Sequence, residues 1–213
     1  MDIWIIKETC LDRDYERIGI ELQNGWTIID IGAGLGDFSI YAADKSKQGK
    51  VYAFEPFPDS FKLLQENIEL NGVQNVFPYQ KALASKPGTL SLETGTGIAV
   101  MHSTAQTSDN DTRIQVPSVT LSQAFTENNL LHCDFLKIDC EGGEYDILMN
   151  GDKETLSKIK HICLEYHDGF TKHSHDDLVN FLQGNGFEVT TEPNPVHAIT
   201  GILYARNNAP SLL

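Results

Sequence analysis

Short apolar runs alternate along the chain with segments in which apolar residues recur at every third or fourth position. The runs cover residues 27–31, 51–54, 76–79, 135–138 and 162–166. Runs of this length are typical of strands that are buried on both faces of a parallel sheet. The segments between them carry helix signals, such as Pro58 and Asp59 shortly before Phe61 and Leu64. The alternation predicts an α/β fold in which helices flank a mostly parallel sheet.

Two regions before the C-terminal part depart from this alternation. In residues 1–26, Leu11, Tyr15, Ile18 and Leu22 recur at helical spacing, which predicts a helical leader. Residues 84–118 are a predicted insert, with strand patterns on either side of a polar stretch at 94–112. We expect this insert to cover a bound substrate.

The C-terminal part completes the predicted sheet. Strand patterns at 187–191 and 201–205 are joined by a Pro-Asn-Pro turn, which predicts an antiparallel edge and brings the sheet to seven strands. The main domain then spans residues 27–206, and residues 207–213 are predicted to be a frayed tail.

Length and charge limit the classes of function. The 213 residues suit one domain, and the formal net charge of -14 lacks the basic surface that nucleic-acid binding needs. No apolar run approaches the roughly 20 residues of a membrane span. Four cysteines without a Cys-x-x-Cys pair indicate free thiols. We expect a cytoplasmic protein that binds neither nucleic acid nor membrane, and self-association into a homo-oligomer stays open.

The sequence D-I-G-A-G-L-G-D at residues 30–37 predicts a cofactor site. Three glycines, Gly32, Gly34 and Gly36, lie between the first apolar run and a helix that starts at Asp37. Such a turn lets a ligand approach the backbone, and the free amides of the helix start supply donors. A dinucleotide site has its third glycine where this chain has Asp37. Asp30, inside the strand, suits a ligand that carries a positive charge.

Glu55 is a second candidate for cofactor binding. It ends the second apolar run, 19 positions after Gly36. In doubly wound folds an acid about 20 residues after the glycine turn accepts hydrogen bonds from ribose hydroxyls. Dehydrogenases and adenosyl-binding transferases both predict this acid, so Glu55 supports the fold more than the chemistry.

Several blocks of sequence resemble one family. The string at 30–37 resembles the first motif of S-adenosylmethionine-dependent methyltransferases. The block that starts V-Y-A-F-E-P at 51, the block D-F-L-K-I-D-C-E-G-G-E-Y-D-I-L at 134–148 and H-I-C-L-E-Y-H at 161–167 resemble successive blocks of the FkbM family. The resemblance implies a Rossmann-like class I methyltransferase fold, S-adenosylmethionine as cofactor, and O-methylation of a hydroxyl on a small molecule such as a sugar or polyketide-type metabolite.

One position departs from the pattern of related methyltransferases. Lys81 stands near the place where many of them have an acid that binds adenine, so we expect the backbone around Ala82 to serve instead. Two alternatives to the methyltransferase stay open. One is a cofactor-binding or partner-docking module without turnover, and the other, less favoured, is a nicotinamide-dependent oxidoreductase.

Charged residues gather at the predicted carboxyl ends of the fourth and fifth strands. Asp139 and Glu141 follow the fourth strand, whereas Glu165 and His167 end the fifth. In one interpretation Asp139 or Glu141 holds the methionine end of the cofactor, and His167 acts on the acceptor hydroxyl. In a second, Asp139, Glu165 and His167 bind a divalent metal. In a third, Glu144 and Glu165 pair with Lys137 or cap helices. We favour the first for Asp139 and Glu141, and the role of His167 stays open. The catalytic candidates are His167 and Asp139.

Overall fold

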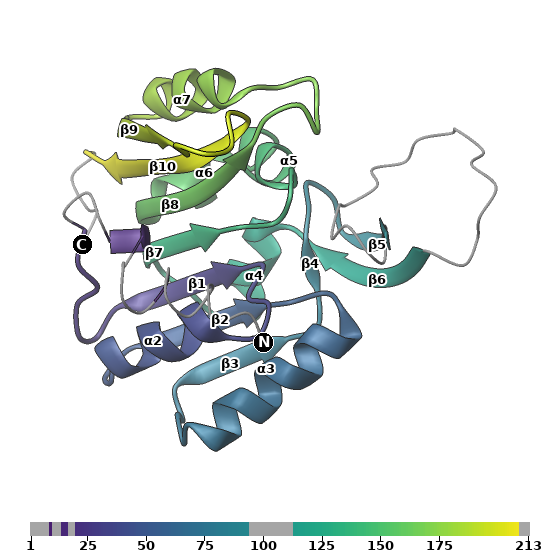
Figure 1. Cartoon of the computed structure of the whole chain (residues 1–213). Coiled ribbons are helices and arrows are strands. Elements are labelled where there is room, and N and C mark those ends of the chain that lie inside the picture. The colour runs from purple at the N-terminus through teal and green to yellow at the C-terminus, as the bar shows by residue number, and fades with distance from the viewer. Residues whose placement is uncertain (1–8, 10–13, 17–19, 94–112, 209–213) are drawn as a thin grey trace.

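The computed structural model describes residue 9 and residues 14–16, 20–93 and 113–208, and its centre is a seven-stranded sheet (Figure 1). The strands lie in the order β3-β2-β1-β7-β8-β10-β9. Their bounds are β1 (Thr27–Ile31), β2 (Lys50–Phe54), β3 (Val76–Tyr79), β7 (Cys133–Ile138), β8 (Ile159–His167), β9 (Phe187–Pro193) and β10 (Thr200–Asn207). The seven strands confirm the α/β prediction.

The sheet is parallel from β3 to β8, and β10 runs antiparallel to both of its neighbours, β8 and β9. The antiparallel strand therefore lies one place inside the edge, and β9 forms the edge itself. Because β1, β2, β7 and β8 are parallel, their carboxyl ends meet at one side of the sheet. This is the order and direction of strands in Rossmann-like class I methyltransferases, as expected from the sequence.

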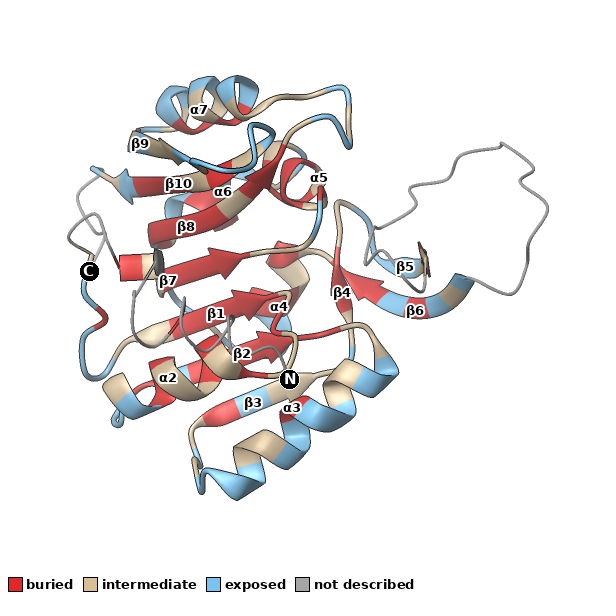
Figure 2. Cartoon of the chain, in the orientation of Figure 1, coloured by how far each residue is buried: buried red, intermediate tan, exposed pale blue. Residues whose placement is uncertain are grey.

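Helices cover both faces of the sheet, as the burial pattern shows (Figure 2). On one face α2 (Asp37–Lys45) and α3 (Pro58–Leu70) pack with Ile28 of β1, and on the other α4 (Leu121–Glu127), α5 (Glu144–Met149), α6 (Lys153–Ser157) and α7 (His175–Gly184) pack with Ile29. Successive strand residues point to opposite faces, so both Ile28 and Ile29 are fully buried. Burial on both faces explains why these strands read as continuous apolar runs.

A second, three-stranded sheet lies beyond the carboxyl ends of the main strands (Figure 1). It consists of β4 (Ala82–Leu83), β5 (Gly88–Glu93) and β6 (Arg113–Val119), in the order β4-β6-β5. Its own small core contains Ala82, Leu92 and Val116. The strand patterns at either side of the insert are confirmed, but their pairing into a separate sheet with β4 was not predicted.

Other predicted segments lie partly outside the described residues. Of the predicted leader helix, Leu11 and Ile18 fall outside, Tyr15 lies in a short 3-10 helix, η2 (Asp14–Glu16), and Leu22 is buried in irregular chain. The polar stretch 94–112 and residues 209–213 also fall outside. Every helix in the described part of the chain is too short or too polar to cross a membrane.

Candidate functional site

The glycine turn after β1 makes close contact with two neighbouring elements. Gly32, Gly34 and Gly36 have φ values of 73°, 54° and 89°, in the left-handed region that glycine adopts readily. A Cβ on Gly32 would lie 1.7 Å from the backbone oxygen of Asp139, and one on Gly36 would lie 2.5 Å from Leu64 Cδ1. A Cβ on Gly34 would meet no atom within 4 Å. Packing thus requires two of the glycines, and the third leaves an open face.

Glu55 faces this turn from the end of β2. It is 4% exposed, and its Oε2 accepts a 2.8 Å hydrogen bond from the Gly34 amide. Its Oε1 accepts a 2.9 Å bond from the Phe57 amide. Burial raises the pKa of the carboxyl, and the two amide donors oppose that rise. The structure therefore brings the two predicted cofactor residues Gly34 and Glu55 into contact.

Asp30 lies behind the turn. It is fully buried, accepts a 2.6 Å hydrogen bond from Ser39 Oγ, and pairs with Lys137 Nζ at 3.2 Å. The same Lys137 Nζ donates to the Gly32 oxygen at 2.8 Å. Asp30 thus holds the turn through a buried lysine and is itself shielded from a ligand in the crevice.

Asp139 follows β7 directly opposite the glycine turn. Its amide donates to the Ile31 oxygen at 3.0 Å, and its side chain is 30% exposed. Tyr15 Oη donates to Asp139 Oδ2 at 3.4 Å, and the Tyr15 ring lies over Lys137 Nζ, 5.5 Å from it. A residue of the N-terminal segment therefore covers the charged group beside the turn.

His167 at the end of β8 is held by a buried glutamate, Glu144, at the start of α5. Glu144 is fully buried, and its Oε1 lies 3.2 Å from His167 Nδ1 and accepts a 2.8 Å bond from the His167 amide. Glu144 Oε2 accepts from the Gly142 amide at 2.8 Å. A carboxylate on Nδ1 fixes the ring plane, so Nε2 is directed away from Glu144.

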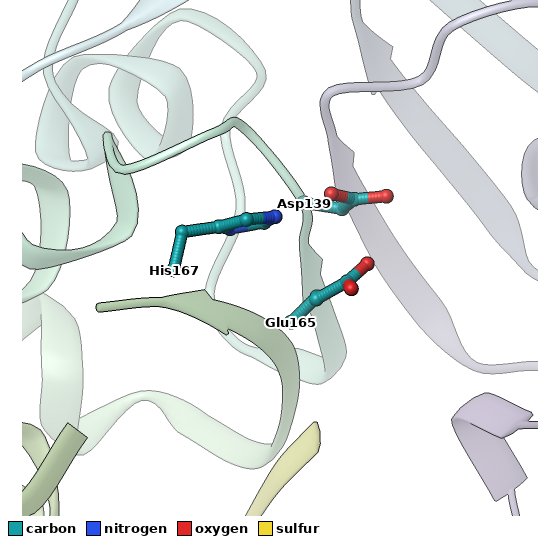
Figure 3. Close-up of side chains that lie close together, drawn as sticks. All are labelled: Asp139, Glu165 and His167. Carbon is teal, nitrogen blue, oxygen red and sulfur yellow. The ribbon is translucent and has the colours of Figure 1, made fainter. Parts of the chain in front are cut away.

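Three acidic side chains surround the other nitrogen of His167. Glu141 Oε2 lies 3.6 Å from Nε2, and the ligand atoms of Asp139, Glu165 and His167 all lie within 4.8 Å of one another (Figure 3). Burial lowers the pKa of His167, but the bond and charge of Glu144 and the charges of Glu165 and Asp139 outweigh this and raise it to about 9. For the Glu141 carboxyl, burial has the opposite effect and raises the pKa.

A cavity of about 640 Å³ opens beside this acidic group. Its lining includes Glu141 and Gly142, the apolar side chains of Leu83 and Leu90, and Phe170. The Phe170 ring also meets the His167 ring edge to face, with 6.1 Å between the centroids. The glycines at 32, 34 and 36 do not line it. The cavity therefore lies next to Glu141 and Phe170 and not at the glycine turn.

Ala82 directly precedes Leu83 of the cavity lining. It is buried in β4, where it pairs in register with Ser118 of β6. Lys81 beside it forms an ion pair with Glu127 at 2.8 Å. The predicted adenine contact of the backbone near Ala82 stays a prediction.

The third interpretation of the acidic residues is wrong where it pairs Lys137 with Glu144. Lys137 bonds Asp30 and the Gly32 oxygen, and Glu144 bonds His167. Sequence reasoning missed Glu144 as the partner of His167. The signal was present, because an acid three positions before the apolar run that starts at Ile147 and a histidine at a strand end both need partners once buried.

The chain is similar in sequence to known proteins. The family model for the methyltransferase FkbM domain matches residues 30–189. The 31-O-demethyl-FK506 methyltransferase FkbM of Streptomyces tacrolimicus is 28% identical over 228 residues, which cover 93% of this chain and 86% of that protein. The hexuronic acid methyltransferase AglP of Haloferax volcanii is 25% identical over 169 residues, which cover 79% of this chain and 67% of that protein.

A further relative is much longer. The AMB antimetabolite synthetase AmbE of Pseudomonas aeruginosa is 26% identical over 225 residues, and the match covers 88% of this chain but 11% of that protein. The chain therefore corresponds to a small part of AmbE.

Solved structures share the fold. The methyltransferase FkbM of Methylobacillus flagellatus matches with a TM-score of 0.61 at 13% identity, covering 90% of this chain and 46% of that one. Fibrillarin of Aeropyrum pernix, solved with natively bound S-adenosyl-L-methionine, matches with a TM-score of 0.53 at 12% identity. The match covers 90% of this chain and 70% of that one. Both support the Rossmann-like methyltransferase architecture described above.

Proposed function

The chain belongs to the FkbM family of methyltransferases, and from that membership we propose that it transfers a methyl group from S-adenosylmethionine to a hydroxyl of a small molecule. The names of two relatives support the acceptor class, since one acts on a 31-O-demethyl compound and the other on a hexuronic acid. The nicotinamide-dependent alternative has no support in the family match.

The residues around the glycine turn fit the cofactor. The open face of Gly34 leaves room for a ligand against the backbone, and the Glu55 carboxylate beside it suits the vicinal hydroxyls of a ribose. Asp139 and Glu141 supply negative charge for the ammonium and sulfonium groups of the methionine end. When bound, S-adenosylmethionine supplies an activated methyl group. Asp30 acts as a positioning residue, through Lys137.

The cavity beside Glu141 supports a small-molecule acceptor. Its volume of about 640 Å³ lies within the roughly 300–1,000 Å³ of ligand sites. Leu83, Leu90 and Phe170 offer apolar surface, and Glu141 adds a polar group near His167. An acceptor whose body rests on this surface presents a hydroxyl to the acidic end of the site.

The observation that carries the proposal is the contact between Glu144 and His167. An alcohol is a weak nucleophile at neutral pH, so its proton must be taken up during attack. Glu144 holds Nδ1 of His167 and aims Nε2 at the space between Asp139 and Glu165. We assign His167 to the acceptor hydroxyl, with Glu144 as its positioning residue.

Two measurements test the proposal. Thermal unfolding is followed with S-adenosylmethionine, S-adenosylhomocysteine and NAD, and the first two are expected to raise the melting temperature. Production of S-adenosylhomocysteine is then measured with hexuronic acids, neutral hexosides and hydroxylated macrolides. Stabilisation by NAD alone would overturn the cofactor. Binding of the sulfonium cofactor without turnover on any acceptor would favour a docking module.

A further inference from the structure

Two neighbouring parallel strands bring three potential metal ligands together. Ile138 of β7 pairs in register with Leu164 of β8, so Asp139, directly after β7, lies beside Glu165, which is still within β8. His167 follows two positions later, on the same side of β8 as Glu165. One ligand atom of each of the three lies within 4.8 Å of the others (Figure 3).

The imidazole is prepared for a ligand on Nε2. His167 is 5% exposed, and Glu144 occupies Nδ1 from a fully buried position. On the other side of the ring, the contact of Nε2 with Glu141 Oε2 measures 3.6 Å, which is longer than a hydrogen bond. Histidines that bind metals usually have this arrangement, with the second nitrogen held by a carboxylate or carbonyl.

The charges around Nε2 also favour a cation. Asp139, Glu141 and Glu165 are close to it, whereas the Lys137 ammonium is directed to Asp30 and lies 3.9 Å from Asp139. Carboxylates gathered in a partly buried site repel one another unless a positive charge lies among them; without metal the protonated His167 ring supplies that charge, and a bound cation would replace its Nε2 proton.

We propose that Asp139, Glu165 and His167 bind one divalent cation of the first transition series, such as Mn²⁺. Two carboxylate oxygens and one imidazole nitrogen suit a transition-metal ion better than they suit Mg²⁺, since imidazole is a poor ligand for magnesium. Three protein ligands would leave further coordination positions for water or a substrate oxygen.

The open positions give the ion a role that rests on the proposed function. An acceptor hydroxyl that binds the ion becomes more acidic and loses its proton more readily. Glu141, which is about half exposed, takes up this proton and passes it to solvent. The oxygen keeps the electron pair with which it would bond the methyl carbon of S-adenosylmethionine, while the bond from that carbon to sulfur breaks and leaves S-adenosylhomocysteine. His167 and Asp139 would then act as metal ligands, in place of direct contact with the hydroxyl and the cofactor, and Glu144 is the residue that fixes the His167 ring.

Metal binding is tested without turnover. The full chain, freed of metal with a chelator, is titrated with Mn²⁺ by calorimetry, and free Mn²⁺ is followed by electron paramagnetic resonance. We expect one ion per chain in the unaltered protein, and at least about tenfold weaker binding in Glu165→Gln and His167→Gln. Asp176→Asn is the matched control. This substitution alters an exposed acid beside His175 at the start of α7, a second place where metal could gather. The Asp176→Asn protein is expected to bind Mn²⁺ as tightly as the unaltered protein.

The outcomes separate the two proposals. Absence of Mn²⁺ binding, equal binding by Glu165→Gln when circular dichroism shows it folded, or loss of binding in Asp176→Asn would overturn the metal site. Metal binding in a chain that methylates no acceptor would leave the site in place and count against the proposed function. Undiminished turnover in excess chelator would overturn the role of the ion at the hydroxyl.

Discussion

Asp30 of β1 and Lys137 of β7 occupy the same register position on neighbouring strands, and their charged groups meet at 3.2 Å. Both side chains are buried to within a few per cent, between the sheet and the glycine turn. The charges of Asp30, Asp139 and Asp37 raise the pKa of Lys137 against the opposing effect of burial. The lysine therefore stays charged and ties the strand, the turn and Asp139 into one unit.

Removal of this lysine is expected to be costly. Lys137→Met leaves the Asp30 carboxylate buried beside an apolar side chain, so we expect a loss of about 3–5 kcal/mol in the free energy of unfolding. The control is Lys62→Met, which removes an exposed pair with Glu66 and should cost at most about 1 kcal/mol. Urea unfolding measures both. Asp30→Asn combined with Lys137→Met should recover part of the loss, and equal losses for the two lysine variants would refute the buried pair.

Gly34 allows the cofactor turn to be altered without a clash. Gly34→Ala places a Cβ in the open face at positive φ, so we expect a loss of about 1–2 kcal/mol in stability from backbone strain. The same Cβ enters the space assigned to the ligand, so affinity for S-adenosylmethionine should fall at least about tenfold. Gly72→Ala is the control, because Gly72 has a similar φ and equally open surroundings at the end of α3. Calorimetry measures the affinity of both variants for S-adenosylmethionine. Unchanged affinity in Gly34→Ala would place the cofactor elsewhere.

His167→Ala is expected to reduce turnover far more than cofactor affinity. We expect kcat to fall by about 10²–10⁴-fold, because the group that acts on the hydroxyl is lost. His132→Ala, at a largely exposed histidine, is the matched control and should leave kcat unchanged. Steady-state kinetics with an identified acceptor provide the measurement. Unchanged turnover would remove His167 from the catalytic residues.

Glu144→Gln tests whether His167 is positioned. The amide keeps one acceptor oxygen but loses the charge that faces Nδ1, so we expect kcat to fall about 10–100-fold. KM for the acceptor should change little, because Glu144 is buried behind the histidine and away from the cavity lining. In the His167→Ala background the same change should have almost no further effect on kcat. Additive losses in the double variant would show that Glu144 acts independently.

His161 predicts a dependence of stability on pH away from the site. Its ring stacks on Trp26 with 5.4 Å between the centroids, and burial, with Lys160 and Arg206 nearby, lowers its pKa to about 4. His161 takes up a proton near pH 6.5 in the unfolded chain but only near pH 4 in the folded chain. The stability that the neutral ring contributes is therefore present above pH 6.5 and is lost as the pH falls towards 4. Between pH 7 and pH 5 it amounts to about 2 kcal/mol.

His161→Phe separates this effect from other titrations. Phenylalanine keeps the stacking on Trp26 and removes the proton site. Denaturant unfolding at pH 7 and pH 5 should show a loss that is smaller in the variant by about 2 kcal/mol. An identical loss in both proteins would mean that His161 is not kept neutral by the fold.

The sequence predicted the parallel strands well because each is buried on both faces. Apolar runs at β1, β2 and β7 leave little choice of structure. The small second sheet was harder, because its two longer strands pair across a polar stretch and β4 has only two residues. Pairing between distant segments leaves no local pattern in the sequence.

The candidate site was predicted in part. Strand order brings Asp139, Glu165 and His167 to one place, and their positions at strand ends gave that expectation. The partners of the site residues were not foreseen, because Asp30 meets Lys137 through sheet register and Glu144 meets His167 through the packing of α5. These contacts depend on three-dimensional placement, which residue spacing along one chain does not contain.

The position of β10 bears on how the protein is made. β8 carries Glu165 and His167, and the second of its two partner strands, at residues 200–207, comes last in the described chain. Until this part has been synthesised, one edge of β8 has unpaired backbone groups, and most of its side chains are of the kind that the finished fold buries. Such an exposed edge promotes aggregation. Shortened chains that stop before residue 200 keep that exposed edge permanently, so they are poor candidates for expression even though the whole glycine turn is present.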